Sequence, residues 1–247
     1  ILLLLGIALC MAGYPAFKEG KTFVATGTMQ HISTLRPAVR IPKQLTDQEI
    51  LNHESTVLQC PLCGEEVKQP WGEVVIPCKG CGHLLDITAD TVKIVPYDLA
   101  KPDLLAMVAM KGVEPEYIPF WRFDVNLEVT DRLAGGDTST GLPNIAGKRS
   151  YYICAADIPR YLAEPWEIDL TIRNPEIVEV IDGRDGEYRP IFINQSTARE
   201  LTEFLYLRYE TEKPGILQVL RYNFTVENSR IVYIPYYKEQ ASYIPGI

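Results

Sequence analysis

The sequence predicts an α+β protein in three parts: an N-terminal membrane-anchoring helix, a small cysteine-bearing ribbon, and a β-rich domain with two or three short helices. Three observations carry this prediction. The chain opens on 17 residues without a charge, four of its six cysteines form two C-x-x-C-G pairs, and a ten-residue segment alternates apolar and polar side chains. We place the anchor at 1–17, an extended linker with a short helix at 18–56, the ribbon at 57–87 and the β-rich domain at 88–247.

Residues 1–17 predict a membrane anchor because they carry no charge. A bilayer-spanning helix needs roughly 20 apolar residues, and residues upstream of Ile1 would supply the rest. Two alternatives stay open: the apolar core of a secretory signal peptide, and a lipoprotein segment ending at Cys10. Leu9 weakens the second alternative, because a small residue is expected before a lipidated cysteine.

The charge that follows the anchor predicts its orientation. Five cations stand between residues 18 and 43 against one anion, Glu19. Lysine and arginine beside a membrane segment favour the cytoplasmic side, and free thiolates survive best there. We therefore expect the rest of the chain to face the cytoplasm, with a periplasmic or extracellular face as the alternative.

The cysteine pairs predict a metal site. The pairs are Cys60-Pro61-Leu62-Cys63-Gly64 and Cys78-Lys79-Gly80-Cys81-Gly82, and fourteen residues lie between Cys63 and Cys78. A C-x-x-C turn directs both sulfurs at one centre, and two such turns supply four thiolates to a tetrahedral ion. This is the spacing of a zinc ribbon, with Cys60, Cys63, Cys78 and Cys81 as the ligands.

Four thiolates close the coordination shell, so the site is expected to be structural rather than catalytic. Three alternatives remain: iron in a rubredoxin-like electron-transfer site, disulfides in an oxidising compartment, and His83 standing in for one cysteine. The ribbon itself is acidic, which disfavours contact with phosphates and favours docking on protein. The local charge comes from Lys68 and Lys79 against Glu54, Glu65, Glu66, Glu73, Asp86 and Asp90.

Whole-chain composition agrees with this reading. A net charge of −8 and a pI near 5.0 disfavour a general nucleic-acid binder. The three histidines all lie between residues 31 and 83, and G-x-S-x-G does not occur, so a serine-hydrolase set is poorly supported. We expect no enzyme and no small-molecule substrate. Cys154 is expected to be a buried core thiol.

Periodicity places the elements that follow the ribbon. Residues 121–130 alternate strictly, which predicts a half-buried strand. A helix is expected after Pro102 and Asp103, ending at Gly112, and a second from a Thr197–Glu200 capping box. Residues 148–156 and 175–183 are plausible strands. The chain is expected to close with a β-hairpin whose turn is Glu-Asn-Ser at 227–229.

A short motif recurs in the β-rich part. Tyr-Ile-Pro-aromatic-aromatic-cation occurs at 117–122 and 233–238, with a weaker copy at 243–247. Proline is tolerated at the first residue of a strand, so Pro119 and Pro235 are expected to begin strands. Packing of the aromatic side chains in the core is favoured over a ligand platform.

Taken in order, the hydrophobic segment, the CPLCG…CKGCG ribbon and the YIPFWR and YIPYYK strands resemble a loose group of uncharacterised bacterial membrane-associated zinc-ribbon proteins. The resemblance covers residues 57–130 and 230–238, and it implies a structural zinc and a membrane setting. It carries over no catalytic residue. We therefore expect an accessory or scaffold subunit of a membrane protein complex, anchored in the bilayer by residues 1–17 and partnered by other subunits.

Overall fold

The computed structural model describes residues 21–24 (backbone only), 58–70, 72–88, 91–110, 112–136, 142–177, 187–239 and 242–247. In these ranges the α+β class is confirmed, because strands predominate and three helices accompany them. None of the described helices is long and apolar enough to cross a membrane. The expected anchor at 1–17, the linker helix and most of the expected strand at 175–183 lie outside the described residues.

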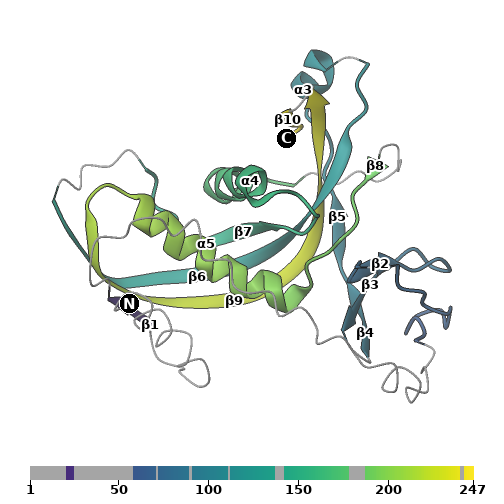
Figure 1. Cartoon of the computed structure of the whole chain (residues 1–247), viewed down its shortest axis with the longest axis horizontal. Coiled ribbons are helices and arrows are strands. Elements are labelled where there is room, and N and C mark those ends of the chain that lie inside the picture. Colours follow the sequence, from purple (N-terminus) through teal and green to yellow (C-terminus); the bar gives the residue numbers. More distant parts are fainter. Residues whose placement is uncertain are drawn as a thin grey trace.

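Two long antiparallel strands, β6 (Glu116–Gly135) and β9 (Ile216–Glu239), form the spine of a seven-stranded sheet (Figure 1). β7 (Gly147–Cys154) and the short β8 (Glu187–Tyr188) pair with β6. Three short strands occupy successive stretches of the outer edge of β9. They are β1 (Lys21–Val24), β5 (Tyr97–Leu99) and β10 (Ser242–Pro245).

The alternation in residues 121–130 is confirmed as a strand inside β6. Trp121, Phe123, Val125 and Leu127 are buried, and the polar residues between them are half-buried. The pattern ends at Val129, which is exposed. Alternation of this kind leaves one face of the sheet apolar, and α5 (Gln195–Glu212) packs on that face through its buried Leu205, among others.

The expected terminal hairpin is wrong. β9 runs without a turn through Glu-Asn-Ser at 227–229 and pairs with β6 on both sides of it. The register shifts there: Asp124 pairs with Asn228 and Val125 with Val226, so Glu227 has no residue opposite it. An extra residue of this kind is a β-bulge. The polar triplet therefore interrupts the strand locally instead of reversing the chain.

The Tyr-Ile-Pro copies pair with one another. Ile118 lies opposite Ile234, and each proline lies opposite the tyrosine of the other copy. The third copy, in β10, pairs with the second. Pro119 and Pro235 thus lie inside strands rather than at their first residues, which corrects our expectation. Their carbonyls still accept hydrogen bonds, from the N–H groups of Ala155 (2.9 Å) and Gly246 (2.8 Å).

Helix α5 begins one turn earlier than expected. Asn194 is the N-cap residue, and its Oδ1 accepts a hydrogen bond from the N–H of Thr197 at 2.9 Å. Thr197 lies inside the helix, so the predicted capping box from Thr197 to Glu200 is wrong. Asparagine is among the best N-cap residues, and Asn194 follows closely on Ile191, which forms an isolated β-bridge with Val75.

A helix that the sequence analysis did not predict, α4 (Arg160–Arg173), lies along β7 (Figure 1). Its polar side chains, and that of its C-cap residue, accept hydrogen bonds from alternate N–H groups of this edge strand. The pairs are Glu167 Oε1 with Cys154 (3.0 Å), Thr171 Oγ1 with Tyr152 (3.3 Å) and Asn174 Oδ1 with Ser150 (3.0 Å). The helix thus takes the place of a neighbouring strand.

The cysteine-bearing region forms its own three-stranded sheet, β2 (Val75–Pro77), β3 (Leu84–Thr88) and β4 (Thr91–Val95). β4 carries this sheet past residue 87, where the sequence analysis ends the ribbon. One face joins the main core, because Val75, Leu84 and Val95 belong to the same buried cluster as Trp121. The N–H of Val74 also donates to the carbonyl of Ile191 at 2.9 Å.

Helix α3 (Leu104–Ala109) lies near β10 at the end of the molecule farthest from the ribbon sheet and β1 (Figure 1). The sequence predicts its limits well. Asp103 is its N-cap residue, and Gly112 takes a φ of 84°, a left-handed conformation that glycine adopts without strain.

Candidate metal centre

The two cysteine knuckles have the same backbone design. In the first, the N–H of Gly64 donates to the carbonyl of Cys60 and the N–H of Cys60 donates to that of Glu65, both at 2.9 Å. In the second, Gly82 and Cys78 make the corresponding bonds at 2.8 Å. Gly64 and Gly82 take φ values of 76° and 74°. Glycine adopts this left-handed conformation without strain, so the glycine after each C-x-x-C relieves a tight turn.

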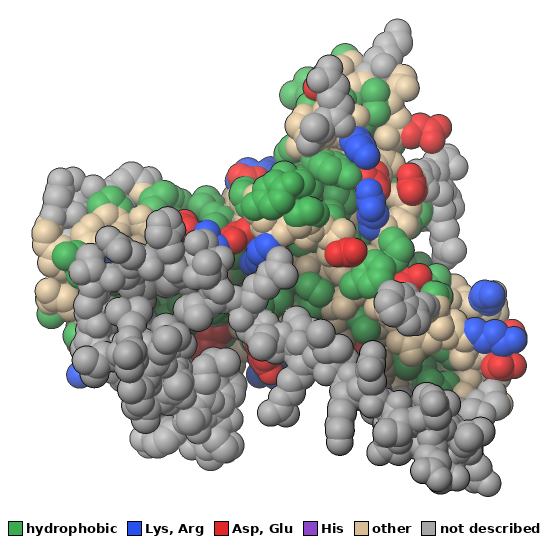
Figure 2. Space-filling view, in the orientation of Figure 1, with side chains coloured by type: hydrophobic (Ala, Val, Ile, Leu, Met, Phe, Trp, Pro, Cys, Tyr) green, Lys and Arg blue, Asp and Glu red, His purple; other side chains and the backbone are tan. Residues whose placement is uncertain are grey.

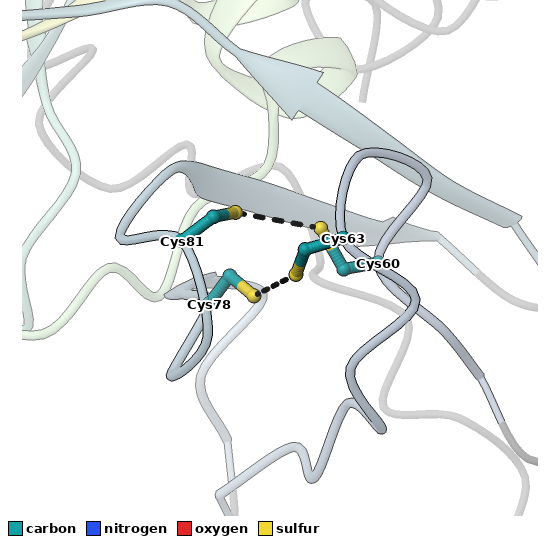
Figure 3. A group of neighbouring side chains, drawn as sticks. All are labelled: Cys60, Cys63, Cys78 and Cys81. Carbon is teal, nitrogen blue, oxygen red and sulfur yellow. Dashed lines mark hydrogen bonds between the residues drawn. The ribbon is translucent and has the colours of Figure 1, made fainter.

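The four sulfurs converge on one point, as Figure 3 shows. Sγ of Cys60 lies 3.7 Å from Sγ of Cys81, and Sγ of Cys63 lies 3.5 Å from Sγ of Cys78. All four lie within 4.8 Å of one another. A tetrahedral ion with metal–sulfur bonds of about 2.3 Å sets its sulfurs about 3.8 Å apart. A disulfide needs about 2.05 Å, so the four cysteines are free thiols placed to hold an ion.

The thiols influence one another's ionisation. The backbone N–H of Cys63 does most to lower the pKa of Cys60, to about 6. The backbone N–H of Glu65 likewise lowers the pKa of Cys63. The thiol of Cys78, partial burial and the two other thiols outweigh it and raise the pKa of Cys63 to about 12. Four thiolates at this spacing repel one another, so a cation is required for all of them to be ionised together.

Short-range packing holds the knuckles in place. The second knuckle is the turn between β2 and β3, and the first is closed by a bridge between Gln59 and Glu66. Beneath them Leu85, which is fully buried, packs with Cys60 and Cys78. This small cluster is separate from the main core, so the metal site has its own apolar support on the opposite face of β3.

One residue of the site escaped the sequence analysis. Gly80 lies inside the second C-x-x-C, and a Cβ there would meet Sγ of Cys63 at 3.1 Å and Cβ of Glu65 at 3.2 Å. The two knuckles approach each other at this glycine. The only signal in the sequence is that Gly80 stands where the first knuckle has Leu62.

Within the described part of the chain, no histidine belongs to this cluster. His83 is exposed, and its carbonyl accepts the N–H of Cys78 at 2.8 Å, while its side chain lies outside the four-sulfur group. His31 and His53 lie outside the described residues. Within the described ranges, no second group of three or more His, Cys, Asp or Glu side chains gathers as a metal site would.

The buried titratable groups elsewhere serve packing. Cys154 is buried as expected, and burial followed by the charge of Glu167 raises its pKa to about 12. Five buried carboxylates face arginines, four of them across elements and Glu167 within α4. The pairs are Asp98–Arg230, Glu116–Arg189, Glu164–Arg208, Glu167–Arg160 and Glu210–Arg132. A carboxylate held in such a pair is poorly placed to exchange protons with a substrate.

The comparisons with known proteins add no relative to this geometry. The described site is a group of four cysteines positioned to bind a metal ion, carried on a three-stranded sheet that shares the core of a larger α+β sheet. The chain matches no protein-family model, no curated protein and no solved structure.

Proposed function

We propose that the chain is a non-catalytic, membrane-anchored zinc-ribbon protein that acts as an accessory or scaffold subunit of a membrane protein complex. The observation that carries the proposal is the convergence of four sulfurs within 4.8 Å. Four thiolates fill a tetrahedral shell and leave no position for water or substrate, which is how structural zinc sites differ from catalytic ones.

Zinc is the proposed ion because thiolate ligands in a tetrahedral set select Zn²⁺ or iron. Zinc has no redox chemistry and suits a purely structural role. Iron in the same cage would make the chain a rubredoxin-like electron-transfer protein, and this is the competing proposal. The solvent exposure of Cys63 and the half-burial of Cys81 leave the site near the surface, which is compatible with either ion.

Metal analysis of the purified chain separates the two ions. We expect one zinc per chain and a colourless protein, and we expect Cys63→Ser with Cys81→Ser to lose the ion. One equivalent of iron with visible absorption would replace the structural proposal by electron transfer. Full metal content in the double variant would refute the four-cysteine assignment itself.

The accessory role is supported by the chemistry that the described residues lack. Apart from Asp86, which accepts a hydrogen bond from Thr88, their buried carboxylates are held by arginines. Their one buried thiol outside the cysteine group has a raised pKa. A hollow of about 470 Å³ between α5 and β9 is lined by residues such as Arg199, Glu203 and Phe224 and contains no histidine or cysteine. The acidic surface of the ribbon favours a protein partner over nucleic acid.

The membrane setting rests on residues 1–17 and on the resemblance to bacterial membrane-associated zinc-ribbon proteins. We expect the full chain to sediment with membranes and to resist extraction by carbonate, with the ribbon facing the cytoplasm. Mild detergent extraction and chemical crosslinking should recover partner subunits with it. Extraction of the chain as a monomer, with no crosslinked partner, would refute the scaffold proposal.

A further inference from the structure

Helix α3 and the turn after it expose an unusual amount of apolar surface. None of the six residues of this helix is buried. Four of its side chains are between 48% and 77% exposed, and one more follows on the turn. We call this group the apolar tip; it consists of Leu104 (70%), Leu105 (77%), Met107 (48%), Val108 (68%) and Val113 (41%).

The apolar tip is not one face of an amphipathic helix. At 100° per residue, Leu104, Leu105 and Met107 point in three different directions around the axis, and each is exposed. A flat protein surface covers a single stripe of a helix, whereas a helix that is apolar all round needs a surrounding apolar medium. A lipid layer supplies such a medium on every side, which favours lipid over the face of a protein partner.

Charge at the tip is balanced and lies outside the apolar run. Between residues 101 and 114 the sequence holds Lys101 and Lys111 against Asp103 and Glu114. No charge falls between Asp103 and Lys111, so the apolar run is flanked by a lysine on each side. Lysine side chains reach from such positions to headgroup phosphates. The tip is thus neutral overall and needs no anionic lipid for attraction.

The tip is fixed to the sheet rather than loosely attached. The N–H of Asp103 donates to the carbonyl of Gly246 at 2.6 Å, just beyond β10. Met107, Met110 and Val113 donate their N–H groups to Asp103, Ala106 and Met110, each at 2.9 Å. These bonds pair part of the backbone around the exposed side chains, and each paired group lowers the cost of moving the tip out of water.

Length sets the depth of insertion. Six helical residues span about 9 Å, far less than the roughly 30 Å hydrocarbon core. The tip lies at one end of the molecule, where Figure 2 shows hydrophobic side chains at the surface. The half-buried Tyr243 stands in the neighbouring β10, with Nζ of Lys238 at 6.0 Å from its ring centroid. Tyrosine and lysine are residues that favour the membrane–water interface.

We propose that the apolar tip inserts into the interfacial layer of a lipid bilayer, as a second contact beside the segment 1–17. The inference rests on the membrane setting of the proposed function, but it concerns different residues and is tested separately. Shallow insertion of Leu104, Leu105 and Val108 would remove from water the side chains that the fold leaves most exposed at this end.

The test places a tryptophan in the tip of the full-length chain. Leu105→Trp is reconstituted with phosphatidylcholine vesicles that carry bromine on their acyl chains, which quench tryptophan on contact. We expect the added emission to shift to the blue and to be lost to bromine quenching, equally at low and high salt because the tip is neutral. The matched control is Ile216→Trp, at an exposed position of β9 (58%), which should remain unquenched.

Absence of quenching at residue 105 overturns the inference, whatever the vesicles bind. Flotation of the same sample reports on the membrane binding of residues 1–17. If the vesicles float the chain but do not quench Leu105→Trp, the anchor proposal stands and the insertion of the apolar tip is refuted. A blue shift of Leu105→Trp that grows with protein concentration in buffer, without lipid quenching, would assign the tip to a second copy instead. Combining Leu104→Glu with Val108→Glu in the Leu105→Trp chain should abolish the quenching without unfolding the chain, because both residues are exposed.

Discussion

At the scale of single residues, the metal centre depends on a glycine as much as on cysteines. Spacing alone identifies the four cysteines that the structure brings together, because two C-x-x-C turns have few other uses. The close approach of Gly80 to Cys63 is a distance between two knuckles, and no local pattern reports it. The grouping of the four cysteines is thus readable from the sequence, whereas the fit between the two turns is not.

We expect Gly80→Ala to weaken metal binding. The added methyl would press on Sγ of Cys63 at 3.1 Å and on Cβ of Glu65 at 3.2 Å, so the knuckles must separate. Changes just outside a ligand shell weaken metal affinity by roughly tenfold or more, which competition with a chromogenic chelator would measure. Lys79→Ala is the neighbouring control and should bind as the natural chain does; equal loss in both would point to a general effect on the turn.

Cys154 should make stability fall with alkali. Its pKa is raised in the folded chain, to about 12, by burial and then by Glu167, so folding favours the protonated thiol. The stabilisation is complete below the unfolded pKa near 9 and is lost as pH rises from there toward 12. The slope approaches about 1.4 kcal/mol per pH unit. Urea unfolding between pH 9 and 10 should show this loss in the natural chain and a flatter curve in Cys154→Ala.

At the scale of elements, the sequence predicts those marked by a strict period or by clear helix-terminal residues. β6 and α3 are found where expected, since period two and helix-terminal residues act locally. α4 was missed because its inner face carries Glu167 and Thr171, which serve the edge of β7 and read as solvent-facing residues. β9 was divided in error because a bulge and a turn use the same polar residues.

Because α4 supplies hydrogen-bond acceptors to the edge of β7, we expect Thr171→Val to lower the unfolding free energy. This isosteric change leaves the N–H of Tyr152 without its acceptor in a buried place, which costs about 1–3 kcal/mol of unfolding free energy. Thr202→Val is a matched control in α5, because that hydroxyl only donates to the carbonyl of Ala198 in its own helix. Chemical denaturation of the two variants should separate them; a smaller loss for Thr171→Val than for Thr202→Val would contradict the role.

The start of α5 predicts another difference. Asn194→Ala should lower the unfolding free energy by about 1 kcal/mol, because the N–H of Thr197 loses its side-chain acceptor. Thr197→Ala should have little effect, since Thr197 is exposed and is not the cap. Chemical denaturation of both variants measures the two losses of unfolding free energy. A larger loss for Thr197→Ala than for Asn194→Ala would support the capping box from Thr197 to Glu200 instead.

At the scale of the whole molecule, the ribbon sheet and the main sheet share one hydrophobic core. Val75, Leu84 and Val95 lie in the core cluster that contains Trp121 and Tyr206. The sequence indicates a ribbon followed by a β-rich region, but the contact between them is made by ordinary alternating residues whose partners lie far along the chain. The partition of the chain stays a prediction, and no local pattern in the sequence indicates this junction.

Removal of the metal should accordingly destabilise the entire chain. Chelation releases the knuckles, disturbs Leu85 and loosens β2 and β3, whose other face belongs to the main core. We expect one thermal transition, shifted downward in the chelated chain, followed both by the near-ultraviolet signal of buried aromatics and by the release of metal. Two separate transitions, with the aromatic signal unchanged by chelation, would show an independent ribbon.

The row of acceptors on α4 has a consequence for assembly. Alternate N–H groups at the β7 border are engaged by carboxylate, hydroxyl and amide oxygens, so this border is a poor template for an incoming strand. Fibre-like polymerisation through the β7 border is thereby disfavoured by the covering helix as well as by Lys148 and Arg149 in β7 itself. A complex built around this chain would have to recruit its neighbours through side-chain surfaces or along the stretches of β9 that β1, β5 and β10 do not occupy.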